Sequence, residues 1–324
     1  MKKFVSLLLA ACMVLTVSAG CSKHSDTYPS RTIELVIPFS EGGASDITAR
    51  QFAVALEKEL GVSISCVNKA AGGTVEGLDF AYAQDADGYT LLWVTNSVLM
   101  KEAQQASDVV FSESFEPLLQ VAVDITLIMV TADSQFKSME ELISFAKEHP
   151  HELTIDGTSP GGFDDYQIAS VCEDLGIDLT YVPYSGGSEV KAAVLGKEVD
   201  IYQDKIASCL PLIQSGDVVP LAVISDEPIT AIPELEWVPT LQELGSDYDV
   251  GPWRGLSVRN ECDPEVINTL KEACVAAYNS AEFQEYLEIN FINIRTPIPQ
   301  DELVENWEAE TESYVPFYEA QGLL

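Results

Sequence analysis

Residues 37–46 of this 324-residue chain read IPFSEGGASD, and this stretch decides how the rest of the sequence is interpreted. The apolar run 33–37 predicts a strand, and a helical pattern begins directly after the glycine pair. A glycine-rich turn between a strand and a helix bares backbone N–H groups at the helix N-terminus, which suits the capture of an anion. The alternative is an ordinary connection in which glycine only relieves strain, and the stretch alone favours that alternative.

The start of the chain predicts export from the cytoplasm. Two lysines precede the apolar run 4–17, which is too short for a comfortable membrane span, and small residues follow it. The letters SAGC at 18–21 are similar to the lipobox of bacterial lipoproteins, although a serine replaces the usual branched apolar residue. A plain signal peptide with a chance cysteine is the alternative. We expect residues 1–20 to be a lipoprotein signal peptide, Cys21 to carry lipid in the bilayer, and 21–29 to be a polar tether.

The chain is strongly acidic. It has 17 lysines and arginines against 52 acidic residues, a formal net charge of −35. Removal of residues 1–20, which hold two lysines and no acid, makes this −37. Such a surface argues against nucleic acid, whose phosphates need basic partners, and against a polybasic membrane-binding surface. Solubility outside the cell is its default explanation.

Cysteines and histidines predict no catalytic or metal site. Of the three histidines, His24 lies in the tether, and His149 and His151 flank a proline in an expected loop. No Ser-His-Asp or zinc motif accompanies them, so we expect no enzyme, no metal and no cofactor. The cysteines of the body are odd in number, which rules out complete internal pairing, and none forms a C-x-x-C pair. They are Cys66, Cys172, Cys209, Cys262 and Cys274.

Short apolar strands alternate with helical segments along the body of the chain. The letters SMEE at 138–141 form a capping box, and helices near 165–175 and 188–195 are closed by glycines. After Pro264 the pattern is mostly helical, and no internal repeat stands out. Strands separated by helices imply parallel α/β sheets. The expected strands are 33–39, 62–68, 90–95, 125–131, 153–157, 179–184, 199–203 and 219–225.

Four segments leave an expected strand through small polar residues. In open α/β sheets the ligand site lies beyond the carboxyl ends of the strands. Each segment is a plain loop by default, but four together predict a cleft lined with N–H and hydroxyl donors. The segments are FSEGGASD at 39–46, VTNSV at 94–98, DGTSPGGFDD at 156–165 and VPYSGGSEV at 182–190.

A set of ordered segments carries a family resemblance over nearly the whole mature chain. They read YPSRTIELVIPFSEGGASDITAR, VNKAAGGTVEG, DGYTLLW, GTS, VPYSGG, GKEVDIYQD, VPTLQELG and WRGL. Each segment alone is weak evidence, whereas the ordered set is specific. With it the chain resembles the extracytoplasmic solute-binding receptors of tripartite tricarboxylate transporters, the Bug-type receptors.

The resemblance implies an α/β, two-domain periplasmic-binding-protein-like fold of type II with a hinged cleft. Domain 1 is then 30–126 with 250–324, and domain 2 is 127–249. It also implies a receptor that holds a small organic anion, a carboxylate, through backbone amides and ordered waters and passes it to membrane transporter subunits. Carried over by motif, the ligand-binding residues are Ser40, Gly42, Gly43, Thr95, Asn96, Ser97, Thr158, Ser159, Gly161, Gly162 and Asp204.

Departures from the family pattern leave the ligand open. Many members have a histidine near Asp165, where this chain reads FDDYQ; Glu41 replaces a small residue or proline, and IYQDK replaces an apolar-Phe-Asp pattern. Extra carboxylates near an anion are unfavourable and keep a cationic ligand open. Alternatively such acids cap helix N-termini, which is the role we expect for Asp46.

Two other functions stay open on sequence alone. The same fold serves a ligand-sensing partner of a membrane receptor as well as a transport receptor. A hydrolase using Ser97 or Ser159 is a further alternative, against which the missing histidine weighs.

Overall fold

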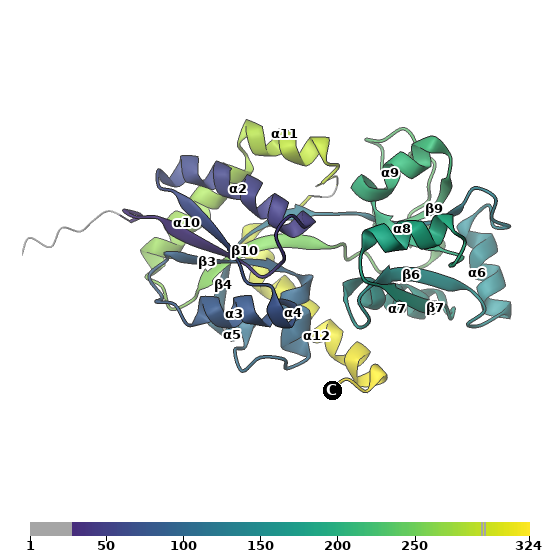
Figure 1. Ribbon diagram of the computed structural model, residues 1–324, viewed down its shortest axis with the longest axis horizontal. Coiled ribbons are helices and arrows are strands. Elements are labelled where there is room, and N and C mark those ends of the chain that lie inside the picture. Colours follow the sequence, from purple (N-terminus) through teal and green to yellow (C-terminus); the bar gives the residue numbers. More distant parts are fainter. Residues whose placement is uncertain (1–27, 293, 295) are drawn as a thin grey trace, which may run out of the picture.

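The computed structural model describes residues 28–292, 294 and 296–324, which form a pair of α/β lobes lying side by side (Figure 1). The expected signal peptide, Cys21 and His24 lie outside the described residues. Among the residues described, no helix combines the length and the apolar character that a membrane span requires.

The first lobe is built on a five-stranded sheet with the strand order β2-β1-β3-β10-β4. Strand β1 runs parallel to β2 and β3, whereas β10 runs antiparallel to both β3 and β4. A strand from late in the chain therefore lies between two early ones. The strands are β1 (Ile33–Ile37), β2 (Ile64–Asn68), β3 (Thr90–Thr95), β4 (Phe115–Val123) and β10 (Trp253–Arg259).

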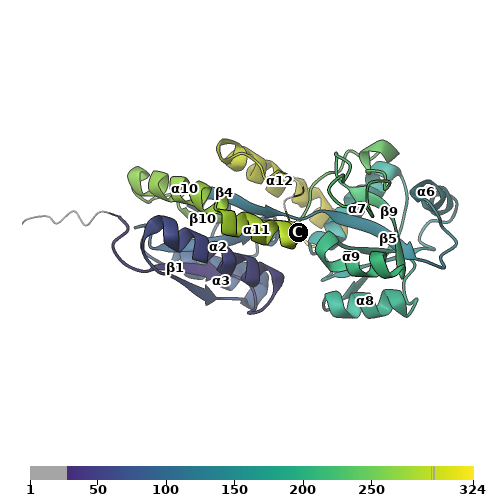
Figure 2. The ribbon, with the colours of Figure 1, turned by 90° about the horizontal axis from the view of Figure 1, so that it is seen from above.

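Helices cover both faces of this sheet, α2, α10 and α11 on one side and α3, α4, α5 and α12 on the other (Figures 1 and 2). Alternation along β1 explains this, because Ile33 and Leu35 join the core shared with α2, whereas Val36 packs with Leu78 of α3. The helices are α2 (Ala44–Leu60), α3 (Val75–Tyr82), α4 (Asn96–Ala103), α5 (Phe111–Ser114), α10 (Pro264–Tyr278), α11 (Ala281–Ile289) and α12 (Leu303–Gln321), with the 3-10 helices η1 (Ala71–Thr74) and η3 (Gln300–Glu302).

The second lobe repeats this plan. Strand β5 lies antiparallel between β8 and β9, β6 pairs with β7 in parallel, and a bridge between Ile155 and Ile201 joins the two groups. The strands are β5 (Thr126–Thr131), β6 (Thr154–Thr158), β7 (Thr180–Tyr184), β8 (Tyr202–Lys205) and β9 (Val218–Ile224). The helices are α6 (Met139–Glu148), α7 (Phe163–Leu175), α8 (Gly187–Leu195) and α9 (Ile206–Ser215), with the 3-10 helix η2 (Gln242–Leu244).

Two crossings that touch each other join the lobes. The chain passes from β4 to β5 through Asp124, and it returns to β10 through 250–252. The N–H of Asp124 donates to the carbonyl of Pro252 at 2.8 Å. A Cβ on Gly251 would lie 2.3 Å from the Asp124 carbonyl oxygen, so only glycine fits there. The domain boundaries expected at 126/127 and 249/250 stay a prediction.

Some sequence expectations need correction. The sheets are not wholly parallel, because β5 and β10 each enter from the other lobe and run antiparallel to their neighbours. The strand expected at 199–203 begins later, and β8 spans Tyr202–Lys205. Ser138 caps α6 by accepting from the Glu141 N–H at 3.4 Å, but the Glu141 carboxylate accepts from the Lys137 N–H and does not close the reciprocal box. The five cysteines of the body are free thiols.

Candidate ligand-binding site

A cleft between the lobes consists of two adjoining compartments that share Phe39, Ser97, Ser159 and Gly162. The first compartment, with a volume of about 290 Å³, is also lined by Lys205 and Arg254 among others. The second compartment, of about 320 Å³, is lined by Ser40, Thr74, Lys101 and Tyr318 among others. Residues of both lobes therefore enclose both spaces.

Four helices begin at the first compartment. Its lining includes Ala44 and Ser45 of α2, Asn96 and Ser97 of α4, the first residues of α7, and Lys205 at the N-cap of α9. The first N–H groups of a helix have no intrahelical acceptor, and the helix dipole makes that end positive. The compartment is thus surrounded by donors that favour an anion.

The turns before α2 and α7 share one short motif, S-x-G-G-x-x-D, at 40–46 and 159–165. In the first turn the N–H of Gly42 donates to Asp46 Oδ2 at 2.9 Å, and in the second the N–H of Gly161 donates to Asp165 Oδ2 at 2.9 Å. Both glycines have positive φ, +76° and +67°, which side chains rarely adopt. The lobes therefore present equivalent turns to one cleft, and this short repeated motif corrects the sequence-based expectation of no internal repeat.

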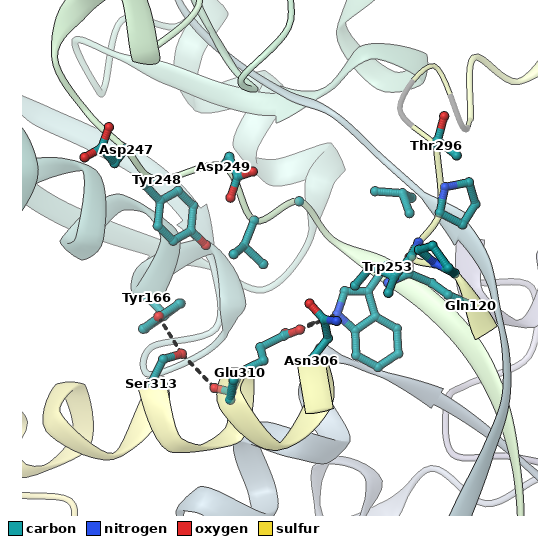
Figure 3. A pocket seen from close by; sticks show the side chains of 17 residues that line it. Gln120, Tyr166, Asp247, Tyr248, Asp249, Trp253, Thr296, Asn306, Glu310 and Ser313 are labelled. Atoms are coloured by element: carbon teal, nitrogen blue, oxygen red, sulfur yellow. Dashed lines mark hydrogen bonds between the residues drawn. The ribbon is translucent and has the colours of Figure 1, made fainter. Parts of the chain in front are cut away.

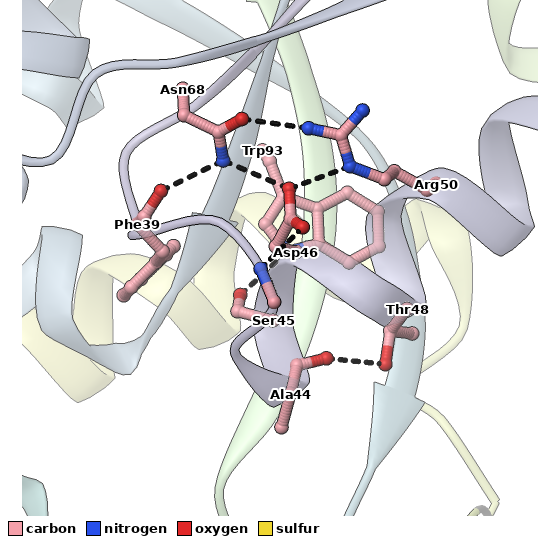
Figure 4. A network of polar contacts seen from close by, with 9 residues as sticks. Phe39, Ala44, Ser45, Asp46, Thr48, Arg50, Asn68 and Trp93 are labelled. Carbon is pink, nitrogen blue, oxygen red and sulfur yellow. Dashed lines mark hydrogen bonds and ion pairs between the residues drawn. The ribbon is translucent and has the colours of Figure 1, made fainter.

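Asp46 acts as the cap of the first turn (Figure 4). Its Oδ1 accepts from Arg50 Nε at 2.9 Å and from Asn68 Nδ2 at 2.8 Å, and Asn68 Nδ2 also donates to the carbonyl of Phe39 at 2.9 Å. Burial acts to raise the pKa of Asp46, but the bonds from Arg50, Asn68 and Gly42 outweigh it and lower the pKa below its usual value. This geometry supports the expected capping role. It also means that the Gly42 N–H is occupied within the turn.

The donors of the first turn therefore lie one step further along, at Ala44 and Ser45. The Ser45 hydroxyl accepts from Trp93 Nε1 at 2.9 Å, which fixes its position in the cleft wall. In the second turn, Asp164 Oδ2 accepts from Thr158 Oγ1 at 2.6 Å and from the Thr158 N–H at 3.1 Å. One carboxylate oxygen of Asp164 is thus bonded to Thr158 in the cleft wall. Burial raises the pKa of the neighbouring residue Asp165.

The side chain of Asn96 belongs to a polar junction outside the cleft. Its Oδ1 accepts from the Trp253 N–H at 2.9 Å, and its Nδ2 donates to Glu310 Oε1 at 2.6 Å. Trp253 Nε1 and the Tyr314 hydroxyl donate to the same carboxylate, yet burial raises the pKa of Glu310. Only the backbone N–H of Asn96 is left to face a ligand.

Glu310 also lines a third cavity, of about 650 Å³, together with Tyr166, Tyr248 and Asp249 (Figure 3). This is larger than either cleft compartment, but among the described residues that line it none is at the N-terminus of an α-helix, and only Pro299 caps a 3-10 helix, η3. Trp253 lines both this cavity and the first compartment. The cleft is therefore the candidate ligand site, and the junction around Glu310 lies behind its wall.

The structure brings together eight of the eleven residues predicted to bind ligand. The exceptions are Gly42 and Gly43, which shape the first turn, and Asp204, whose carboxylate accepts from the Tyr202 hydroxyl and the Lys205 N–H. That the others contact ligand stays a prediction. The eight cleft residues are Ser40, Thr95, Asn96, Ser97, Thr158, Ser159, Gly161 and Gly162.

Sequence reasoning missed two cations, Lys205 and Arg254. Arg254 lies inside WRGL, a segment that carries the family resemblance, whereas Lys205 directly follows such a segment and ends IYQDK, a departure from the family pattern. The available signal was a basic residue at a strand end in so acidic a chain. Arg254 is paired with Asp124, Nη2 to Oδ2 at 2.6 Å, and both side chains are buried.

Comparison with known proteins finds one family along most of the chain. The family described as tripartite tricarboxylate transporter family receptor (TctC) matches residues 48–305. A UPF0065 protein of Bordetella pertussis is 28% identical over 303 residues, which cover 93% of each chain. Protein BugT of the same organism is 29% identical over 266 residues, covering 80% of this chain and 81% of BugT.

Solved structures share the fold. A TctC solute-binding protein from Polaromonas, without ligand, superposes with a TM-score of 0.80 and 24% identity over 91% of this chain and 100% of its own. MatC of Rhodopseudomonas palustris with bound malate gives a TM-score of 0.70 and 22% identity over 89% and 99% of the two chains. Rpa4515 of R. palustris with adipate gives 0.70 and 23% over 91% and 98%. The fold is therefore that of periplasmic solute-binding proteins.

Proposed function

Because the chain belongs to the tripartite tricarboxylate transporter receptor family, we propose that it captures a small carboxylate outside the cytoplasm and delivers it to a membrane transporter. The family is one of receptors, so the chain is a binding protein and not an enzyme, and the hydrolase alternative is wrong. Lipid anchoring through Cys21 and transfer to transporter subunits belong to the proposal.

One observation carries the carboxylate assignment: helix N-termini from both lobes surround the first compartment. Hydrogen bonds in which the acceptor is charged contribute roughly 1.5–3 kcal/mol each. A carboxylate reaches donors of both lobes together only when the cleft is closed. Ligand therefore shifts the population toward the closed form.

The acidic surface does not oppose this assignment. At physiological salt the Debye length is about 8 Å, so distant surface acids are largely screened, whereas the helix donors act at hydrogen-bond distance. The proteins of the same fold named MatC and Rpa4515 were solved with malate and with adipate, which supports a carboxylate as the ligand class.

The carboxylate proposal is tested by calorimetric titration with malate, adipate and, as a cation of similar length, putrescine. We expect at least one carboxylate to bind, to raise the melting temperature and to reduce the radius measured by small-angle scattering. Gly162→Val is expected to weaken that binding at least tenfold, because a Cβ there would lie 3.0 Å from the Ser159 carbonyl oxygen at the cleft wall.

The matched control is Gly187→Val, at the start of α8, where a Cβ has no neighbour within 4 Å. It should bind like the wild type. Binding of putrescine in preference to every carboxylate, or equal affinity of the two valine variants, would contradict the proposed site.

The anchoring proposal concerns Cys21, which lies outside the described residues. One acyl chain binds membranes only marginally, whereas two or three hold firmly. We expect Cys21→Ala to move the protein from the membrane to the soluble envelope fraction or the medium, as followed by detergent phase separation. A variant that still partitions into the detergent phase would show that lipid on Cys21 is not the anchor.

A further inference from the structure

The first compartment is lined by two basic side chains that are not among the residues predicted to bind ligand. Arg254 lies in β10 of the first lobe, and Lys205 occupies the N-cap position of α9 in the second lobe. The Arg254 side chain is only 9% exposed, and its Nη2 donates to Asp124. Its Nη1 is buried and has no hydrogen-bond partner among the described residues. A buried donor without an acceptor is destabilising, so this guanidinium has capacity for one more anionic group.

Lys205 is charged and is also without a direct partner. Within the described residues its Nζ takes part in no hydrogen bond or ion pair. Burial acts to lower the pKa of Lys205, but the carboxylates of Asp164, Asp124 and Asp204 outweigh it and hold the pKa above its ordinary value. The positive charge of Arg254 opposes that effect. Both side chains line the same compartment. They come from opposite lobes, so a ligand that contacts both side chains bridges the cleft.

We propose that Lys205 and Arg254 form a second anion subsite, which binds a second carboxylate of the ligand across the two lobes. This inference rests on the proposed function, in which the first carboxylate binds at the helix N-termini. The ligand class is then a dicarboxylate short enough for a compartment of about 290 Å³. A second carboxylate between the cations gives the unpartnered Arg254 Nη1 an acceptor and gives Lys205 Nζ a direct anionic partner.

The acids around this subsite do not already fill that role. Asp124 bonds to one Arg254 nitrogen, Asp204 accepts from the Tyr202 hydroxyl and a backbone N–H, and one oxygen of Asp164 is taken by Thr158. None lies within ion-pair distance of Lys205 Nζ among the described contacts. Asp164 is the one carboxylate among the described residues that line the compartment, and it would instead favour an amine, so the test includes one.

The experiment compares each linear diacid of four to six carbons with its own monoamide, which keeps length and shape but has one negative charge. Affinities are measured by calorimetry with the chain lacking residues 1–20. The wild type is expected to prefer the diacid at least tenfold, because a charge-assisted bond to a buried cation is lost in the amide. In Lys205→Met that preference should fall about tenfold or more, while affinity for the monoamide changes little.

The matched control is Lys197→Met, which removes the same charge from the second lobe outside the cleft lining and should keep the full preference. Arg254→Lys keeps the positive charge beside Asp124 and should retain part of the preference for the diacid. This variant is used because complete removal of the arginine charge could disturb folding. If Lys205→Met keeps the wild-type preference, or if an amino acid of equal length binds better than the diacid, the subsite is wrong and the proposed function stands. If the wild type binds no carboxylate, both are wrong.

Discussion

The Asp156→Asn variant is expected to be more stable than the wild type at pH 9, by about 5–6 kcal/mol. Asp156 lies in β6, the strand that leads into the second turn of the cleft, and has no solvent exposure. Its Oδ1 accepts from the Gln203 N–H at 3.0 Å, but its Oδ2 has no partner among the described residues. Burial, aided by the charges of Asp204 and Asp164, raises the pKa of Asp156 to about 8.

The sign of the effect follows from the unfolded state, in which an aspartate has a pKa of about 3.9. Below that value both states are protonated and the native stability is complete. As pH rises toward 8, the unfolded chain releases its proton first, so the free energy of unfolding falls by about 1.4 kcal/mol for each pH unit. Asparagine cannot ionise, so the two proteins diverge with pH while they are similar near pH 4.

Urea unfolding at pH 5, 7 and 9 measures this divergence. Asp178→Asn is the matched control, since it makes the same change at an exposed position of the same lobe. It should show no such trend relative to the wild type. A difference between Asp156→Asn and wild type that is constant from pH 5 to 9 would mean that the buried carboxylate is ionised throughout.

The local features of the fold could be predicted because local residues determine them. Gly61 and Gly176 end α2 and α7 in the left-handed conformation, and Ser138 caps α6, as their patterns indicate. The place of β10 between β3 and β4 could not be predicted, since the pairing of Gly255 with Val94 and Gln120 depends on contacts between segments more than 130 residues apart in sequence. Such pairing has no local signature.

The candidate site shows the same division. The turns and helix starts that line the cleft are visible as strand ends followed by small polar residues. The hydrogen-bond partners of each polar group are not visible in the sequence, because they come from residues far along the chain. Asn96 was expected to bind ligand, but its side-chain amide is held by Glu310, 214 residues away. Arg254 became a candidate only when its partner Asp124 and its unpartnered Nη1 were located.

Asp46→Ala is expected to lower the free energy of unfolding at pH 7 by about 2–4 kcal/mol and to weaken carboxylate binding. Asp46 is 3% exposed, and it accepts from Gly42, Arg50 and Asn68 (Figure 4). Breaking a buried ion pair costs about 3–5 kcal/mol. The lower estimate of about 2–4 kcal/mol applies here because the Arg50 side chain is 43% exposed, so water can replace some of the lost interaction.

Asp87→Ala supplies the contrast, because its ion pair with Arg31 is exposed on both sides and such pairs contribute about 0–1 kcal/mol. Chemical denaturation of both variants at pH 7 gives the comparison. Since the pKa of Asp46 is lowered in the native state, its contribution is present above the unfolded value of about 3.9 and is lost as pH falls through the native pKa. The two variants should therefore differ most at neutral pH and converge in strong acid. Equal losses at pH 7 would mean that the 40–46 turn keeps its shape without its cap, and the weakened binding would then need another cause.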